Sequence, residues 1–580
     1  MNRILARLTR LSILLTPLLC FGVSPKISPD LVGVPPQTTV TVIIRFSSPL
    51  DNPGKQKLKN QGATLKADLG LIRSAVYTVT AAALNGIAND PQVVYISADR
   101  SVGATLDYAS PTVGAQIALQ YGWDGTGVGI ALIDSGITSS PDLKDPANPN
   151  PSTSRIVYSQ SFVGQAPTAP DQYGHGTHVA GILAGNGSAS TGPNYSRTFV
   201  GMARHANLIN LRVLDGNGMG TDSAVISAIN RAIELKSTYN IRVINLSLGR
   251  PVYESYSKDP LCQAVEKAWQ AGIVVVVAAG NEGRNRSQGT DGYATITSPG
   301  NDPLVITVGA MKHMGTRWRA DDLIASYSSK GPTLIDHVVK PDLVAPGNRI
   351  VSLASYNGLI ATGSAANKVP ASYYQLAPSQ NFSSDYYQLS GTSMAAPMVS
   401  GAAALMLQKD PGLTPDTVKA RLMRTATKSF PMFSTVVDPV TNETFTSQYD
   451  IFTVGAGYLD VWAAMNATED APLTGAAASP TAVLDSVTGS VSIVNSTAAV
   501  WGTAAVWGTA AVWGTAAVWG TSVFVDGAAA VWGTAAVWGT AAVWGTGGTQ
   551  GSAAVWGTGA VWGTGRTAGE ILNQLVNGEN

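Results

Sequence analysis

The sequence predicts an α/β protein with an open, mostly parallel sheet and helices on both faces. Near-continuous apolar, β-branched runs of strand length are typical of parallel strands covered on both sides: GVGIALID, ANLINLRVL, RVINLSL, IVVVVAAG and PLVITVGA. Helical patterns alternate with these runs or follow them: GTHVAGILAG, DSAVISAINRAIELKS, CQAVEKAWQAG, MAAPMVSGAAALMLQ and DTVKARLMRTAT. In such sheets, sites collect at the carboxyl ends of the strands.

A smaller α+β segment precedes this region, over residues 38–105. Four strand patterns occur there: TVTVIIRF, ATLKADLGLI, SAVYTVT and VVYISADR. Two short helical patterns, KQKLKNQG and AAALNGIAND, separate them. The resulting order, β-α-β-β-α-β, is that of the ferredoxin-like split βαβ arrangement. Its place between a signal and the larger domain suggests a segment that assists or blocks that domain.

Residues 1–24 have the pattern of a secretory signal. Three arginines in MNRILARLTR precede about 13 mostly apolar residues, LSILLTPLLCFGV, which are too few to span a bilayer comfortably. The alternative, a buried core helix, is disfavoured by Pro17. We therefore expect a protein that is secreted or held at the cell surface, with no stable transmembrane segment. Removal of the signal, which includes Cys20, leaves Cys262 without an intrachain disulfide partner.

Charge composition gives no argument for a strongly charged partner. The chain has 37 acidic and 37 basic residues among 580, a formal net charge of zero. A protein that binds nucleic acid through its phosphates usually carries excess positive charge. We expect no nucleic-acid partner.

The C-terminal part changes composition. Residues 469–490 are rich in Ala, Pro, Ser and Thr and predict a linker. The hexad AAVWGT recurs over 491–566, and residues 567–580 form a tail. A six-residue period keeps successive Trp residues on one face of an extended chain but scatters them around a helix, so the tract favours strands wherever it is ordered. The spacing of 13 residues from Trp519 to Trp532 breaks this parity. A flexible low-complexity tail is the open alternative.

Three residues suited to nucleophilic catalysis stand where strands end or helices begin. Asp134 ends the strand GIALID, His175 lies in DQYGHGTHVAG, and Ser393 opens the alanine-rich helix after Gly-Thr. Serine needs a base such as imidazole, and a carboxylate fixes the imidazole tautomer. Alone, Ser393 fits an ordinary helix N-cap equally well. The Asp and the His favour catalysis, and Asn281 in AAGNEG adds an amide that can donate to an oxyanion.

These motifs resemble the subtilisin-like serine endopeptidases, the subtilase family, in secreted bacterial form. The matching words are ALIDSGI, HGTHVAGILAG, VINLSLG, VVVAAGNEG, KPDLVAPG and GTSMAAP, and the likeness extends over about 106–468. The order Asp, His, Ser is that of subtilisin. The resemblance implies a catalytic triad of Asp134, His175 and Ser393, with Asn281 as the oxyanion donor. It also implies that residues 38–105 are an inhibitory, folding-assisting propeptide, an intramolecular partner of the enzyme.

The resemblance further implies a substrate-binding surface. Ser247, Leu248 and Gly249 would pair with an extended substrate, and Ala278, Ala279 and Gly280 would wall the primary specificity pocket. The spacing from Asn281 places Gly292 at the pocket floor, which leaves room for a large apolar residue before the scissile bond. One or two methylenes discriminate by only about 1–3 kcal/mol, so we expect broad specificity.

Metals and cofactors are not required by the implied chemistry. His178 follows His175 by three residues, whereas zinc proteases of the HExxH type space their histidines by four around a Glu, so His178 is expected to pack beside the triad. Asp142 matches a position that binds structural calcium in some relatives, although the loop after the HGTHVAG helix departs from the calcium pattern. Calcium at Asp142 is an expectation that rests on the resemblance alone.

Two rival functions are open to test. The first is a cell-surface adhesive or self-assembling protein whose protease domain mainly processes itself; deleting 491–566 separates it from an ordinary enzyme, which would keep its hydrolysis. The second is an inactive pseudoprotease, which the intact Asp134, His175 and Ser393 disfavour. Autoprocessing near residues 106–109 is expected to release the mature enzyme.

Overall fold

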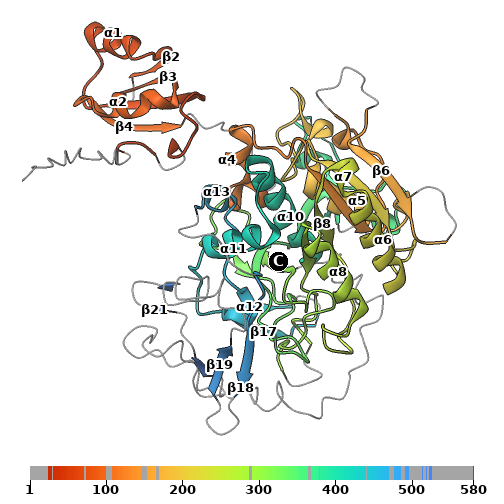
Figure 1. Cartoon of the computed structure of the whole chain (residues 1–580). Helices are drawn as coiled ribbons and strands as arrows, with labels where there is room; N and C mark the ends of the chain where they lie inside the picture. Colours follow the sequence, from red (N-terminus) through yellow and green to blue (C-terminus); the bar gives the residue numbers. More distant parts are fainter. Residues whose placement is uncertain are drawn as a thin grey trace, which may run out of the picture. The chain divides into compact units, whose positions relative to one another are not determined.

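A computed structural model places the chain in two compact units, Met1–Val102 and Gly103–Asn580, which are described separately (Figure 1). The structure describes residues 24–28, 31–70, 73–98, 108–145, 153–164, 169–285, 290–363, 367–377, 379–438, 441–468, 476–484, 490–494, 512–513, 517–518, 522–524 and 579. The predicted signal lies outside these residues except for its last position. Among the described helices, none combines the length and the apolar character that a bilayer crossing requires.

The first unit is an antiparallel four-stranded sheet with two helices, in the predicted order β-α-β-β-α-β. The strands lie in the spatial order β2-β3-β1-β4, and every neighbouring pair is antiparallel. The elements are β1 (Thr39–Phe46), α1 (Asn52–Asn60), β2 (Thr64–Leu69), β3 (Ser74–Thr80), the 3-10 turn η3 (Ala81–Ala83), α2 (Leu84–Ala88) and β4 (Val93–Ala98).

Alternation along β1 explains why this sheet has one buried face. Val40, Val42, Ile44 and Phe46 are buried, whereas the threonines and the arginine between them are exposed. Successive side chains of a strand point to opposite faces, so the apolar set forms the core of the unit. Asp51 starts α1 by accepting the Gly54 N–H at 2.8 Å, as an N-cap residue does.

The second unit is built on an eight-stranded sheet in the order β11-β10-β9-β8-β5-β7-β6, with β12 also paired to β10. All pairs are parallel except β10 with the short β11. The chain builds outward from β5 in both directions, so a topological switch point lies at its carboxyl end. The strands are β5 (Gly129–Asp134), β6 (Ile156–Ser161), β7 (Asn207–Arg212), β8 (Ile241–Leu246), β9 (Val274–Ala278), β10 (Ile306–Lys312), β11 (Leu323–Ile324) and β12 (Leu343–Pro346).

Two pairs of helices cover this sheet. α5 (His175–Ala184) packs on β5 and β7 and contacts α10 (Thr392–Lys409), which lies over β8, β9, β10 and β12. α6 (Asp222–Glu234) and α8 (Pro260–Gln270) contact each other and pack on strands β5 and β7 to β9. Every residue of β5 is buried, as expected for a strand covered on both faces.

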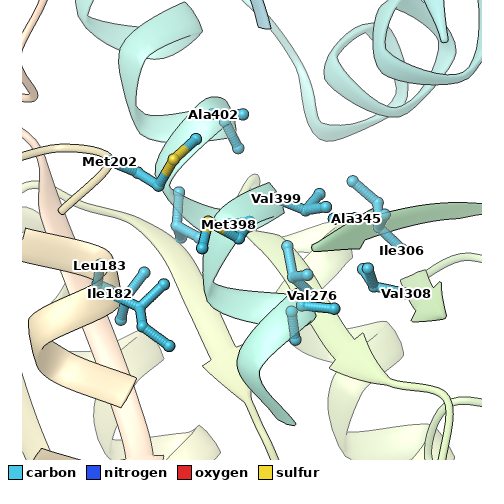
Figure 2. Packing of buried hydrophobic residues seen from close by; sticks show 14 of the residues in the cluster. Ile182, Leu183, Met202, Val276, Ile306, Val308, Ala345, Met398, Val399 and Ala402 are labelled. Carbon is cyan, nitrogen blue, oxygen red and sulfur yellow. The ribbon is translucent and has the colours of Figure 1, made fainter. Parts of the chain in front are cut away.

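The apolar interior of the unit lies between α5, α10 and the sheet. Figure 2 shows Ile182 and Leu183 of α5, Met398, Val399 and Ala402 of α10, and Val276, Ile306, Val308 and Ala345 of the strands beneath. Met202 packs against α10 where the helix has a glycine: a Cβ at Gly401 would lie 2.2 Å from the Met202 Cβ. The glycine of α10 therefore lets the segment before β7 that carries Met202 approach this helix closely.

Shorter elements complete the second unit. The helices are α3 (Ala109–Thr112), α4 (Ala115–Gln120), α7 (Lys236–Tyr239), α9 (Leu359–Gly363), α11 (Pro415–Thr425), α12 (Ile451–Val454) and α13 (Val461–Met465), with one-turn 3-10 segments at Pro141–Leu143, Ser188–Ser190 and Ala371–Tyr373. β13 (Ile350–Leu353), β14 (Lys368–Pro370) and β15 (Phe382–Leu389) form an antiparallel sheet, and β16 (Phe433–Val437) pairs with β17 (Thr444–Gln448).

Residues 476–484, which composition placed in a linker, instead pack on the second unit. Ala477 is fully buried, and Pro480 accepts a hydrogen bond from the Val339 backbone N–H at 2.8 Å. Ser479 is buried and donates to the carboxylate of Asp342, which also pairs with Lys340 and Lys419. The small side chains that mimic a linker are those that fit this tight contact.

The described parts of the hexad tract lie in short strands. β18 (Thr481–Leu484) pairs with β19 (Ser490–Val494), β19 pairs with β22 (Ser522–Phe524), and β20 (Val512–Trp513) pairs with β21 (Ala517–Val518). Most of the tract, including eight of its nine hexad tryptophans, lies outside the described residues. Its role stays a prediction.

Candidate active site

The carboxyl end of β5 meets the start of α5 at a buried acid–imidazole pair. The carboxylate Oδ1 of Asp134 lies 2.8 Å from Nδ1 of His175 and also accepts the Ser135 N–H at 2.7 Å. A carboxylate can only accept, so Nδ1 carries the proton and Nε2 is the acceptor nitrogen. Burial alone would lower the pKa of His175, but attraction to Asp134, their hydrogen bond and the charge of Asp171 together raise it above its ordinary 6.5.

Asp171 organises the start of α5, and the sequence analysis did not single it out. Its Oδ1 accepts from Ser135 Oγ at 2.8 Å and from the Gly174 N–H at 2.7 Å, and its Oδ2 accepts the Thr177 N–H at 2.8 Å. Burial raises the pKa of Asp171, although these donors oppose that rise. The stretch DQYGHG did contain a signal for this role. Helix α5 has no side-chain N-cap at Gly174, and an aspartate lies three residues before that glycine.

Ser393 is the second residue of α10, and Pro397 shapes its surroundings. The proline has no N–H, so it cannot bond to the carbonyl four residues earlier, which belongs to Ser393. That carbonyl instead accepts a hydrogen bond from Ser247 Oγ at 2.8 Å. The hydroxyl of Ser393 donates to the Ser247 carbonyl at 3.2 Å. Two bonds therefore fasten the start of α10 to the residue after β8.

A second pair of buried side chains supports this junction. Asn245 in β8 donates to Ser247 Oγ at 3.0 Å and accepts from Ser400 Oγ of α10 at 2.8 Å. Asn245 and Ser400 are both fully buried. Because a buried amide is costly unless its polar atoms are bonded, these contacts specify how α10 sits on β8.

Asn281 follows β9 and faces the same helix start. Its Oδ1 accepts from the Thr392 N–H at 2.9 Å and from Thr392 Oγ1 at 3.1 Å. A methyl group placed at Gly391 would lie 3.3 Å from Asn281 Nδ2 and 3.7 Å from the Ser393 nitrogen. The two nitrogen atoms thus lie within 4 Å of one position beside Gly391, as does Asn281 Oδ1 at 3.6 Å, and Thr392 holds the amide through that oxygen.

The residues proposed for substrate binding lie on two neighbouring chain segments beside this space. Ser247, Leu248 and Gly249 follow β8, with Gly249 exposed and Leu248 half-buried. Ala278, Ala279 and Gly280 end and follow β9, which is parallel to β8. The two segments leave the sheet side by side at the edge that carries Asp134.

The floor of the predicted pocket is a correction to the sequence analysis. Gly292 packs against the main chain of Gly283, where a Cβ would lie 1.9 Å from the carbonyl oxygen. The side chain between the two walls is that of Thr297: a Cβ at Gly249 would lie 2.5 Å from its Oγ1, and one at Gly280 would lie 2.9 Å from its Cγ2. Spacing from Asn281 gave Gly292, but the chain folds back so that Gly292 lies against Gly283, and Thr297, five residues on, lies beside the wall glycines.

His178 and Cys262 have structural surroundings. Nε2 of His178 lies 3.0 Å from the Ile350 carbonyl and 3.2 Å from that of Tyr387, and burial lowers the pKa of this histidine to about 3. His178 is therefore neutral and lies between α5, which carries it, and the strands β13 and β15. Cys262 is buried in α8, where burial raises the pKa of its thiol. Met394, next to the candidate nucleophile, is fully buried in the core.

The surroundings of Asp142 do not fit a calcium ion. Its two carboxylate oxygens accept from the Ala189 N–H at 2.7 Å and from the Tyr386 hydroxyl at 2.8 Å. The cation beside this loop is the buried guanidinium of Arg155, which donates to four main-chain carbonyls, at 3.1 Å for Lys144, 2.6 Å for Asp142, 2.6 Å for Ala184 and 3.0 Å for Ala206. Among the described residues there is no cluster of three His, Cys, Asp or Glu suited to a metal. The expectation of calcium at Asp142 finds no support in these contacts.

A parallel α/β sheet that carries an acid, an imidazole and a hydroxyl in the order Asp, His, Ser is the architecture of a class of serine proteases. A model of the subtilase family matches residues 125–457, more than half of the chain. The chain belongs to the subtilase family and is a subtilisin-like serine protease, a hydrolase.

Similar proteins agree with this membership. The serine protease AprX of Bacillus subtilis (strain 168) is 36% identical over 396 residues, which cover 66% of this chain and 82% of AprX. Subtilisin DY of Bacillus licheniformis is 36% identical over 324 residues, covering 56% of this chain and 92% of the relative. Subtilisin E of Bacillus subtilis (strain 168) is 33% identical over 379 residues, covering 64% and 80%.

Proposed function

We propose that the chain is a secreted serine endopeptidase that cleaves peptide bonds by acyl transfer through Asp134, His175 and Ser393. The observation that carries the proposal is the buried 2.8 Å contact between His175 Nδ1 and Asp134 Oδ1, which leaves Nε2 as a base. The helices that hold His175 and Ser393 pack against each other. Apo geometries of catalytic hydrogen bonds are often loose, so the Ser393 hydroxyl turns from the Ser247 carbonyl to His175 when substrate binds.

The reaction proceeds in two halves. Ser393 Oγ attacks the scissile carbonyl as its proton passes to His175 Nε2, and the charge that develops on the oxygen is held by Asn281 Nδ2 and the Ser393 N–H. His175 then protonates the leaving amine, and the acyl-enzyme forms. Water, deprotonated by His175, attacks the acyl-enzyme and releases the second product. No metal or cofactor takes part in these steps.

Replacing the nucleophile tests the assignment. Ser393→Ala should abolish labelling by a fluorophosphonate probe and peptide hydrolysis, and should leave residues 38–105 attached if that segment is a propeptide removed by the enzyme itself. Ser227→Ala is a control, since it removes an exposed hydroxyl of α6 that lies away from the proposed chemistry. Unchanged hydrolysis or labelling in Ser393→Ala would refute the nucleophile, and normal maturation would refute self-processing.

We propose broad specificity for apolar residues before the scissile bond, with pocket depth set by Thr297. The expectation of a large residue rested on Gly292, which lies elsewhere, so Thr297 is the side chain to vary. Thr297→Gly should raise kcat/KM for Phe relative to Ala substrates by about 10–200-fold, the range for one or two methylenes in an apolar pocket. Gly292→Ala should instead disturb the Gly283 main chain and lower stability without altering the Phe/Ala ratio. An unchanged ratio in Thr297→Gly would refute this placement.

A further inference from the structure

A buried acidic side chain from residue 579 lies inside the second unit, far along the chain from the segments around it. The Glu579 side chain has no exposed surface. Its Oε1 accepts from Arg284 Nη2 at 2.7 Å, from the Ser326 N–H at 2.8 Å and from the Ser326 hydroxyl. A carboxylate without water is costly unless it is paired and hydrogen-bonded; these three donors compensate Oε1, whereas Oε2 has no hydrogen-bond partner among the described residues.

The main chain of Glu579 is held as well as its side chain. Asn348, which is buried, donates from Nδ2 to the Glu579 carbonyl at 2.8 Å and accepts the Glu579 N–H through Oδ1 at 2.9 Å. One amide side chain thus satisfies both polar groups of one residue, as a neighbouring strand does in peptide recognition by an exposed strand edge. The pocket therefore contacts both the backbone and the acidic side chain of its occupant.

Two cationic side chains, those of Arg284 and Lys312, lie near the Glu579 carboxylate. Arg284 is 12% exposed at its side chain, stacks on the Phe445 ring at 4.7 Å and pairs with Asp438 through its other terminal nitrogen. Lys312 is buried nearby; burial lowers its pKa and the charge of Glu579 opposes that shift. Without Glu579, Arg284 would lose one of its two carboxylate partners in a largely dry site.

We propose that Arg284, Ser326 and Asn348 form a binding pocket for an acidic peptide segment, and that residue 579 of this chain is its occupant. The pocket adjoins the candidate active site through the main chain, because Arg284 lies three residues after Asn281 and the Gly283 N–H donates to the Tyr327 carbonyl at 2.8 Å. Occupancy therefore fixes the segment that follows the oxyanion donor.

The test uses the full chain carrying Ser393→Ala, which prevents self-digestion and makes the readout independent of the proposed function. Glu579→Gln keeps the size of the side chain and removes its charge; Glu570→Gln removes the same charge nine residues earlier. Hydrogen exchange followed by mass spectrometry should show the Ser326 amide exchanging about tenfold faster or more in Glu579→Gln, since hydrogen bonds to charged groups are among the strongest. Glu570→Gln should exchange like the parent. Equal exchange in Glu579→Gln and the parent would overturn the proposal.

A rescue experiment separates loss of the pocket contact from general misfolding. Adding the peptide LVNGEN to the Glu579→Gln chain should restore slow exchange at Ser326 in a saturable way, whereas LVNGQN should not. A further experiment combines Arg284→Gln with Glu579→Gln. Substitutions of contacting residues have non-additive effects, so the Ser326 amide of the double variant should exchange more slowly than the product of the two single increases in rate predicts. Failure of LVNGEN to slow exchange, or strict additivity, would count against the pocket.

Discussion

Replacing Asp171 by asparagine should weaken the start of α5 and the basicity of His175 together. Asparagine keeps one oxygen, which serves Ser135 and Gly174, but it places an NH₂ group against the Thr177 N–H that Oδ2 accepts at 2.8 Å. Thr177 is fully buried, so its N–H loses its acceptor. A buried donor left unsatisfied costs about 1–3 kcal/mol, and the two retained bonds lose their charge assistance. We expect a loss of roughly 3 kcal/mol in the free energy of unfolding.

The same substitution should move the pH dependence of catalysis. His175 acts as a base only when neutral, so kcat/KM should rise with pH through the pKa of this residue. Asp134 and Asp171 raise that pKa against burial. Removing the charge of Asp171 lowers it, because the imidazolium loses part of its stabilisation. The acid limb of the profile should therefore shift to lower pH in Asp171→Asn.

Two measurements check this reasoning. Urea unfolding in the Ser393→Ala background gives the change in stability, and kcat/KM for a chromogenic peptide from pH 5 to 10 gives the acid limb in the active chain. Asp321→Asn is a matched control, since its carboxylate is exposed. An Asp171→Asn enzyme whose acid limb stays in place or moves to higher pH would refute the electrostatic role. A stability loss no larger than that of the control would refute the capping role.

Two further predictions concern buried polar groups. Arg155→Met should lower the free energy of unfolding by about 3 kcal/mol or more, because several buried carbonyls lose their donor. Burial lowers the pKa of Arg155 only to about 10, so it is charged at neutral pH. Adding calcium should not restore the thermal midpoint of Arg155→Met. If calcium stabilised the parent protein and Asp142→Asn abolished that stabilisation, Asp142 would be a calcium ligand and this account would be wrong. Ser479→Ala should lower the free energy of unfolding in urea by about 1–3 kcal/mol, because Asp342 loses a hydrogen-bond donor. Thr474→Ala, five residues earlier, should not lower it. Equal losses of stability in the two variants would show that 476–484 is a linker.

Much of the fold could be predicted because its strands are locally distinct. Runs such as IVVVVAAG are too short and too β-branched for a helix, and β5, β7, β8, β9 and β10 all formed where such runs stand. The order β-α-β-β-α-β of the first unit is likewise a product of local patterns. The strand order β8-β5-β7 could not be predicted in this way, since it depends on which runs pair across the sheet. The packing of 476–484 was missed because Ala477 and Ser479 have the composition of a linker.

The residues of the candidate site likewise include some with a local sequence signal and some that only tertiary structure brings together. Asp134, His175, Ser393 and Asn281 each stand at a strand end or a helix start, which is a local signal. Thr297 was missed because the return of the chain after Gly283 is a tertiary feature, so counting from Asn281 led to Gly292. Arg155 was missed because its partners are main-chain carbonyls, which leave no trace in the identity of the residues that supply them.

The proline inside α10 has a consequence for how attack is aimed. Since the helix does not use the carbonyl of Ser393, that oxygen joins the nucleophile to Ser247, the first residue of the segment proposed to hold the substrate. Ser393 and the segment proposed to bind the substrate are thus joined directly by a hydrogen bond. The distance between the nucleophile and the proposed substrate-binding segment is therefore fixed by the folded protein before a substrate binds.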